Sequence, residues 1–339
     1  MAARLALNLH PPRTGARPLN PARDLGAVAD LLETVFADDL DPGGRQMIRE
    51  ARSLARSGLM LHLISPWSSA AGSLFPGIIW EESGRVVGNV TVGNSARRPG
   101  NWQVANVAVH PDFRGQGIGR RLMEATIDQV LNRSGRQISL QVRDTNPAVA
   151  LYQRMGFRPL GSVTRWISTG RPRLGALHTS GSPVRPAQSK DWLALWQLFR
   201  SVTVAAQGWP DPLTMPHFRP RWWRSLLQLL NDETMRRWVA PAPFDGILDG
   251  YVELHGIAGR YRLTLRVRTG AVGQVEGDLL QEALSAVDRA GDGTVVIDHP
   301  SEEKTAEERF REAGFRADRT LILMQLQLKP QGGDSDGNI

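Results

Sequence analysis

The sequence predicts an α/β (α+β) fold, a mixed and largely antiparallel sheet flanked by helices, and it predicts this fold twice in succession. First, segments of alternating β-branched residues are interspersed with segments of helical spacing. Second, a turn rich in glycine and arginine joins one such strand to one such helix. Third, the chain repeats itself: the stretch from Asp191 resembles that from Asp24, and residues 313–316 resemble residues 155–158.

The composition limits the number of domains and the classes of protein to which the chain can belong. The 339 residues suggest about two domains, and 41% hydrophobic residues are enough for real cores. No apolar run approaches the length of a membrane span, so we expect a cytoplasmic protein that does not act at a membrane. The absence of cysteine excludes disulfides, thiolate metal sites and a thiol nucleophile. A net charge of +7 favours anionic partners.

Hydrophobic periodicity and the turn-forming and capping residues predict the elements of the first copy in order. Residues 1–15 are expected to form a flexible leader, and a first strand follows near residues 16–19. Helices are predicted over 24–36 and 45–56. Strands over 77–82 and 85–95 form a hairpin at Ser83-Gly84. The next strand, 101–109, ends at Pro111. A helix over 118–131, a strand over 137–142 and a short helix follow, the last beginning at Asn146 and ending at Gly156.

The central feature is the junction at residues 114–120, Arg-Gly-Gln-Gly-Ile-Gly-Arg. A helix start carries unpaired N–H groups and partial positive charge. Glycines let a phosphate approach those donors, and arginines add full charges. The pattern is neither a P-loop nor the dinucleotide-binding motif, because no Lys-Ser/Thr follows and Arg120 stands where a third glycine belongs. It predicts a diphosphate-binding turn; an ordinary glycine-rich turn is the alternative.

Together with a second motif about thirty residues later, this junction resembles the GNAT superfamily of acyl-CoA N-acyltransferases. The first motif is Arg-x-x-Gly-x-Gly at 114–119 after a strand. The second runs from Asn146 through Ala150, Leu151 and Tyr152 to Gly156-Phe157. The order of strand, two helices, three antiparallel strands, turn and helix is also that of the family.

The resemblance implies a mechanism and a set of site residues. Acetyl-CoA would be the donor and coenzyme A the product, with no metal. The strand at Val107–Val109 would pair with the pantetheine arm, beside a gap between splayed strands, and the Val109 amide would polarise the thioester. Tyr152 would protonate the leaving thiolate, although it could be an ordinary helix residue. The implied cofactor contacts are Val107, Val109, Arg114, Gly115, Gln116, Gly117, Ile118, Gly119, Arg120 and Asn146.

No general base is assigned. The carboxylate that many family members carry before the turn is missing, since Ala105 and Asn106 stand there. Each candidate could equally be a solvated surface residue, and a water chain to solvent is an alternative. The candidates are Glu81, Glu82, Asp39 and His110.

The second copy is predicted to have lost the cofactor site. In a register without gaps, Val275 replaces Gly117, Phe310 replaces Tyr152, and Glu276 enters the turn. Three further changes are Arg114 to Val272, Arg120 to Asp278 and Asn146 to Lys304. Two carboxylates at a helix start would repel a diphosphate, so we expect one acyl-CoA site per chain. The predicted division is an active domain at 16–168, a linker at 169–183, a degenerate domain at 184–329 and a disordered tail at 330–339.

Three classes of function remain open from the sequence. The first is an N-acetyltransferase acting on a primary amine of a small molecule or peptide, and the second is a non-catalytic acyl-CoA-binding regulator. The third is nucleic-acid binding through aromatic and basic residues of the second half, which are more simply read as a helix core with arginines outside. Those residues are Trp209, Trp222, Trp223, Trp238, Arg219, Arg221, Arg224, Arg236 and Arg237. Nucleic acid is not the expected partner, and the sequence names neither the acceptor nor the oligomeric state.

Overall fold

The computed structural model describes residues 14–37, 42–56, 77–94, 99–202 and 233–328, the last range without 245, 258 and 292. The chain divides into two compact units that do not follow sequence order. Unit 1 comprises residues 1–141, 151–157 and 325–339, and unit 2 comprises residues 142–150 and 158–324. Within the described part, no helix is both long and apolar enough to cross a membrane. The predicted leader, apart from residues 14 and 15, and the predicted tail lie outside the described residues.

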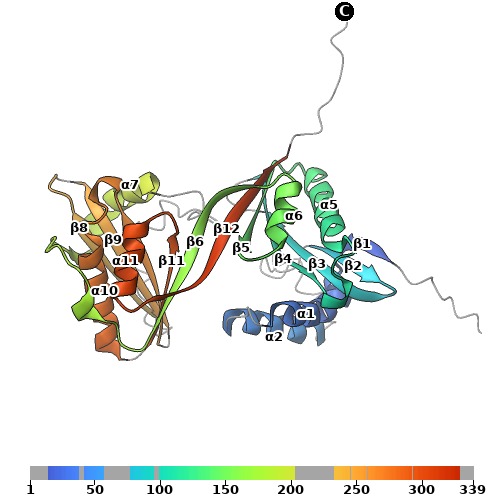
Figure 1. The fold of residues 1–339 in the computed structure, drawn as a ribbon, viewed down its shortest axis with the longest axis horizontal. Coiled ribbons are helices and arrows are strands. Elements are labelled where there is room, and N and C mark those ends of the chain that lie inside the picture. The colour runs from blue at the N-terminus through green and yellow to red at the C-terminus, as the bar shows by residue number, and fades with distance from the viewer. Residues whose placement is uncertain are drawn as a thin grey trace, which may run out of the picture. The chain divides into compact units, whose positions relative to one another are not determined.

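Unit 1 contains a sheet with the strand order β1-β2-β3-β4-β5 (Figure 1). The strands are β1 (Gly15–Pro18), β2 (Gly77–Glu82), β3 (Arg85–Asn94), β4 (Asn101–Val109) and β5 (Gln137–Arg143). The first four pair antiparallel, and β5 runs parallel to β4. The predicted hairpin at Ser83-Gly84 is confirmed, with both residues at positive φ, 50° and 84°, as a tight hairpin turn requires.

Helices cover both faces of the unit 1 sheet. On one face α1 (Pro21–Phe36) packs with α2 (Pro42–Arg56), and Val28 and Leu32 join Ile79 and Ala108 in a common core. On the other lies α5 (Ile118–Leu131), so close that a Cβ on Gly88 would meet Leu122 at 2.8 Å. The predicted start of α1 at residue 24 was three residues late. Asn20 caps the helix by accepting the Ala22 N–H, and Pro21 fits the first position.

Unit 2 repeats this plan with the strand order β6-β11-β10-β9-β8-β7. Its strands are β6 (Arg158–Thr169), β7 (Arg185–Pro186), β8 (Glu233–Pro241), β9 (Leu248–Ile257), β10 (Arg260–Val267) and β11 (Thr294–Pro300). The helices are α7 (Trp192–Val202), α10 (Glu276–Ala290) and α11 (Lys304–Glu312), followed by β12 (Arg316–Gln327). The core gathers under α10, where Leu279, Leu280 and Leu284 are fully buried.

Unit 2 contains a strand from the first half of the sequence, and unit 1 contains the last residues of β12. In unit 2, β6 pairs antiparallel with β11 over Val163–Thr169, and Figure 1 shows the green β6 beside the red β11. In unit 1, the end of β12 is joined to the sheet: the Leu328 N–H donates to the Arg136 carbonyl at 2.8 Å. The compact units therefore differ from the sequence ranges 16–168 and 184–329, because alternation in a strand shows its buried face but not its partner.

The duplication is visible in an ion pair found once in each unit. In unit 1, Arg17 grips Asp24 through two hydrogen bonds of 2.6 and 2.8 Å. In unit 2, Arg185 grips Asp191 through two hydrogen bonds of 2.7 and 2.9 Å. Each aspartate also accepts the backbone N–H of the N-cap residue of its own helical segment, Asn20 in unit 1 and Gln188 in unit 2. Such a repeated bidentate pair supports two copies of one ancestral fold.

The α6 helix (Ala148–Arg154) lies between β5 and β6 in the sequence. Asn146 accepts the Ala148 N–H at 2.9 Å, which is the predicted cap. Gly156 follows the helix at a φ of +91°, and this left-handed conformation explains the predicted stop.

Candidate functional site

A bulge and a separation of strands interrupt the unit 1 sheet in the middle of β4. Asn106 adopts a φ of +51°, which is rare for a residue with a side chain. Opposite it, the register between β3 and β4 shifts between Asn89 and Thr91. On the other side of β4, parallel pairing with β5 ends at Val104–Leu140. The splay implied by the resemblance is therefore present, and the bulge lies just past the last paired residue.

Three polar side chains hold the bulge in place. Asn89 is fully buried and donates from Nδ2 to the Asn106 carbonyl at 3.0 Å. The Asn106 amide donates in turn to the Thr91 hydroxyl at 3.3 Å. Sequence reasoning missed Asn89 and Thr91. The sequence did contain a signal, an asparagine within a strand of β-branched residues. Asparagine is disfavoured in strands unless its side chain hydrogen-bonds to a nearby backbone group.

The end of β4 directs its backbone groups toward the splayed edge. The His110 N–H donates to the Val87 carbonyl of β3 at 2.8 Å. Successive residues of a strand present their backbone groups to opposite edges, so the Val109 N–H faces away from β3, where β5 has diverged. Arg114 donates from Nε to the Val109 carbonyl at 3.2 Å. This contact brings a guanidinium to the same edge.

The turn that follows has the conformation expected of an anion-binding loop. Gly115 and Gly117 have φ values of +79° and +76°, which other residues adopt at a cost. Helix α5 begins directly afterwards, and its N-cap Gly117 provides no side-chain hydrogen bond to the first amides. Arg120 pairs with Glu124 at 2.8 Å, both exposed on the helix surface. The turn itself is exposed apart from the buried Ile118 and the half-buried Gly119.

Tyr152 lies on the part of α6 that belongs to unit 1, with only 4% of its surface exposed. Its ring lies 5.9 Å from that of Phe157. Burial raises the pKa of the Tyr152 phenol to about 12, so the hydroxyl remains protonated at physiological pH. Asn146 belongs to unit 2 with residues 142–150, and the contact that the structure gives its side chain is the helix cap.

Two of the four base candidates are engaged elsewhere. Glu81 is 3% exposed and accepts from Arg17 at 2.6 Å and from Arg23 at 3.2 Å. The hydrogen bond from Arg17 lowers the pKa of the Glu81 carboxyl despite its burial, so this residue holds β1 to β2. The His110 Nε2 lies 3.0 Å from a guanidinium nitrogen of Arg85. A guanidinium only donates, so the imidazole lone pair is occupied.

The other two candidate bases are Glu82 and Asp39. Glu82 accepts from the Thr14 hydroxyl and from the Trp80 indole, each at 3.2 Å. Asp39 lies outside the described residues. Within the described ranges, then, no carboxylate takes the place of the missing family glutamate on β4.

In unit 2, the corresponding turn is occupied by a side chain of the protein itself. Glu276 is 2% exposed, and its carboxylate accepts the Gly273 N–H at 2.8 and 2.9 Å and the Val275 N–H at 3.3 Å. These are amides of the turn that precedes α10. An anion at a helix start is stabilised by such donors, and here the anion is covalently part of the chain.

The segment predicted as a linker adds a second cover to this helix start. Asp278 accepts the backbone N–H groups of Ser180 and Gly181, each at 3.1 Å. A Cβ on Gly277 would lie 1.9 Å from the His178 carbonyl oxygen. The segment predicted as a linker is therefore packed onto unit 2. Glu276 and Asp278 were expected to repel a diphosphate, and in the structure both also accept hydrogen bonds from backbone N–H groups of the chain.

The aromatic and basic residues of the second half fall into two groups. Trp238 belongs to the buried core of unit 2, and the neighbouring Arg237 pairs with Glu253 at 2.7 Å. For these two residues the simpler interpretation as packing and internal pairing holds. Most of the others lie outside the described residues: Trp209, Trp222, Trp223, Arg219, Arg221 and Arg224.

Comparison with known proteins agrees with the architecture. The model of the acetyltransferase (GNAT) family matches residues 45–157, which include β4, the turn, α5 and α6. Residues 45–157 are therefore similar to the acetyltransferase (GNAT) family. The matched range contains both sequence motifs and the bulged strand, so the resemblance and the observed geometry fall on the same residues.

Curated relatives are similar to short stretches of the chain. The ribosomal protein bS18-alanine N-acetyltransferase of Escherichia coli is 45% identical over 53 residues, 15% of this chain and 36% of that protein. The N-alpha-acetyltransferase RimI of Mycobacterium tuberculosis is 34% identical over 85 residues, 24% of this chain and 52% of that protein. The chain thus spans about half or less of the length of these two relatives.

Solved structures extend the similarity of fold to nearly the whole chain. A GCN5-related N-acetyltransferase from Sphaerobacter thermophilus has a TM-score of 0.61 at 20% identity, over 92% of this chain and 95% of that one. A tandem GNAT protein from the clavulanic acid biosynthesis pathway has a TM-score of 0.56 at 16% identity, over 94% and 100%. The predicted pair of consecutive GNAT folds is confirmed.

Proposed function

We propose that the protein is an acetyl-CoA-dependent N-acetyltransferase with a single acyl-CoA site, in unit 1. The observation that carries the proposal is the contrast between the two turns. In unit 2 the turn amides are held by Glu276 and the helix start is covered by residues 178–181. In unit 1 no side-chain carboxylate within the described residues binds the amides of the turn, and its glycines keep the conformation that an incoming phosphate needs.

The turn and the splayed strand supply the kinds of group that coenzyme A needs. Amides of the turn and the start of α5 would hold the diphosphate, supported by the guanidinium of Arg114. The splayed edge of β4 would hydrogen-bond the pantetheine arm. The full set of proposed contacts within unit 1 is Val107, Val109, Arg114, Gly115, Gln116, Gly117, Ile118, Gly119 and Arg120. Acetyl-CoA supplies an activated thioester and leaves as coenzyme A.

Two groups of the chain would act on the reacting atoms. The Val109 N–H faces the splayed edge, where it donates to the carbonyl oxygen as negative charge develops on it. Tyr152 keeps its proton because burial raises its pKa to about 12, so it remains a hydrogen-bond donor for the departing sulfur. The acceptor nitrogen forms the C–N bond as the C–S bond breaks, and it loses one proton. Since Glu81 and His110 are engaged, we assign that proton to a water relay.

The acceptor is a primary amine. The two curated relatives are named as N-acetyltransferases of a ribosomal protein alanine and of α-amines, so a peptide amine is one class and a small amine is the other. A non-catalytic acyl-CoA-binding protein is the second candidate function, favoured by the engagement of the candidate bases in structural contacts.

The proposal is tested by calorimetric titration of acetyl-CoA into the wild type and three variants. Gly117→Glu places a carboxylate on the turn at a φ of +76°, and we expect it to abolish one site per chain. Gly117→Asn is the matched control, because asparagine tolerates this conformation and adds no charge. Gly175→Glu adds the same charge where a Cβ meets nothing within 4 Å, and we expect normal binding.

Each result has a definite meaning. Two sites in the wild type, or binding that survives in Gly117→Glu, would refute the proposed location. Turnover separates the enzyme from the regulator: coenzyme A released in the presence of an amine is read with a thiol reagent, without background from a protein that has no cysteine. Tight binding without release over a broad amine panel would favour the regulator.

A further inference from the structure

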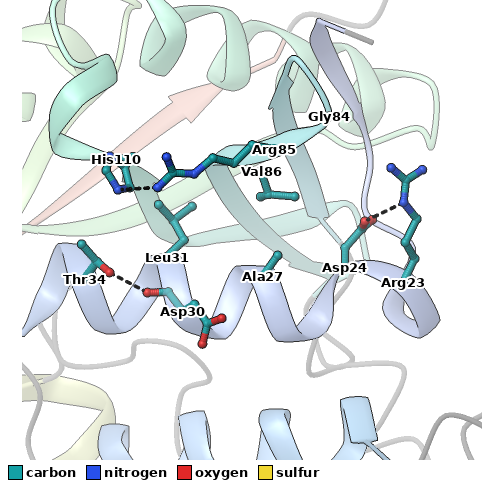
Figure 2. A pocket seen from close by; sticks show the side chains of 10 residues that line it. All are labelled: Arg23, Asp24, Ala27, Asp30, Leu31, Thr34, Gly84, Arg85, Val86 and His110. Atoms are coloured by element: carbon teal, nitrogen blue, oxygen red, sulfur yellow. Dashed lines mark hydrogen bonds and ion pairs between the residues drawn. The ribbon is translucent and has the colours of Figure 1, made fainter. Parts of the chain in front are cut away.

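A pocket of about 480 Å³ lies in unit 1 between α1 and the start of β3. Figure 2 shows Arg85 reaching toward His110 on one side of it, while Ala27, Leu31 and Thr34 of α1 form the other. Its volume is within the range of small-molecule sites. The function proposed above does not use this pocket.

The pocket is adjacent to the proposed reaction centre through the chain itself. His110, which lines the pocket, directly follows Val109, whose amide is assigned to the thioester oxygen. Consecutive α-carbons lie about 3.8 Å apart. The pocket also lies on the face of the sheet covered by α1, since Ala108 packs against Val28 and Leu32 of that helix. A group bound there would therefore contact the residue that directly follows Val109.

Most charges around the pocket are already compensated. Asp24 is held by Arg17 at 2.6 Å, and Asp30 accepts from Arg52 at 2.6 Å. Arg23 pairs with Glu81 at 3.2 Å. These contacts leave neither aspartate as an isolated negative charge facing the pocket.

Arg85 differs from its neighbours. Its guanidinium contacts the His110 Nε2 at 3.0 Å, and no carboxylate within the described part of the chain pairs with it. The guanidinium donates this hydrogen bond to the imidazole, so the contact orients the arginine and supplies no negative charge to compensate it. The remaining donors of the fork have the geometry that suits a carboxylate or a phosphate.

We infer that this pocket binds an anionic group, a carboxylate or phosphate, of the acyl acceptor and so directs the acceptor's amine toward Val109. The inference rests on the proposed acetyltransferase function. Arg85 would hold the anion, His110 would orient Arg85, and the apolar side chains of Ala27, Leu31 and Val86 would contact the carbon skeleton between anion and amine. Arg85 is thus a specificity residue and takes no part in the chemistry.

The test compares acceptors that differ only in one charge. Alanyl-alanine and its C-terminal amide carry the same amine, and only the first has a carboxylate. Coenzyme A release is measured for both, together with succinate and inorganic phosphate binding by calorimetry. The proteins are the full-length wild type, Arg85→Met, Arg85→Lys and the control Arg158→Met, which removes an exposed arginine from β6.

We expect the wild type to use the acid with kcat/KM about threefold to fivefold above that of the amide, because a charge-assisted contact at an exposed site has about this effect. The preference should fall to about one in Arg85→Met, recover in part in Arg85→Lys and persist in Arg158→Met. Succinate or phosphate binding should follow the same order. Stronger binding of succinate than of phosphate would identify the acceptor's anion as a carboxylate, and the reverse order a phosphate.

Failure of the inference is distinguishable from failure of the proposed function. If acetyl-CoA binds normally but acid and amide behave alike, or the acid preference survives in Arg85→Met, the pocket assignment is overturned and the transferase stands. If succinate, phosphate and both peptides fail to bind the acetyl-CoA-competent protein, the pocket assignment is likewise overturned. If acetyl-CoA itself does not bind, the proposed function falls, and the acceptor assignment falls with it.

Discussion

Replacing Glu276 by glutamine should destabilise unit 2, because the carboxylate acts as a built-in anion for its own turn. The side chain is 2% exposed and accepts from the Gly273 and Val275 amides. Glutamine has nearly the same shape, and its single oxygen can replace Oε2 and still accept from both amides, but the buried N–H₂ group that replaces Oε1 then faces the Gly273 N–H with no acceptor. One buried donor is then left without a partner.

The expected loss follows from these contacts. An unsatisfied buried donor costs about 1–3 kcal/mol. Loss of negative charge at a partly buried helix N-terminus adds roughly 1 kcal/mol. The free energy of unfolding of unit 2 should therefore fall by about 3 kcal/mol in Glu276→Gln.

Urea denaturation gives the size of the loss, and hydrogen exchange over residues 276–290 assigns it to α10. Glu282→Gln is the matched control, since Glu282 is exposed on the same helix, and we expect a change within about 0.5 kcal/mol there. Equal behaviour of the two variants would refute the role given to Glu276. Acetyl-CoA stoichiometry should stay at one per chain in Glu276→Gln, because Val275, Asp278 and residues 178–181 still obstruct the turn.

Three further predictions concern unit 1. Tyr152→Phe should lower kcat about a hundredfold at constant KM for acetyl-CoA. Because the pKa of this phenol is about 12 in the wild type, its ionisation should cause no loss of rate below pH 10. An unchanged kcat in the variant would exclude the acid role. Arg17→Met should cost about 3 kcal/mol in urea denaturation at pH 7, because two buried carboxylates lose the guanidinium that they share and keep only the half-exposed Arg23 nearby. The pKa values of Asp24 and Glu81 are lowered from 3.8 and 4.5, so the wild-type advantage should shrink as pH falls below these values, and a pH-independent difference would contradict the ion-pair explanation. Asn89→Ala should weaken acetyl-CoA binding about fivefold by releasing the Asn106 carbonyl, since one hydrogen bond at a buried site is worth about 1 kcal/mol; wild-type affinity would show that β4 forms its bulge unaided.

Elements that depend on neighbouring residues were predictable from the sequence. Gly115 and Gly117 required a left-handed turn, Asn146 and Gly156 bounded α6, and the hairpin formed at Ser83-Gly84. These features are local because caps, tight turns and hydrophobic periodicity involve residues a few positions apart. The replacement of Gly117 and Tyr152 by Val275 and Phe310 in the second copy could likewise be predicted from residue identity alone.

Only the tertiary structure decided which partners distant residues found. Glu81 was a plausible base in the sequence, yet Arg17 and Arg23 hold it in an ion-pair network. Nothing in the pattern of β6 stated that it would pair with β11. The bulge at Asn106 needed Asn89 from another strand. Periodicity in a sequence specifies which face of an element is buried, whereas pairing, charge compensation and strand exchange depend on what lies opposite that face in space.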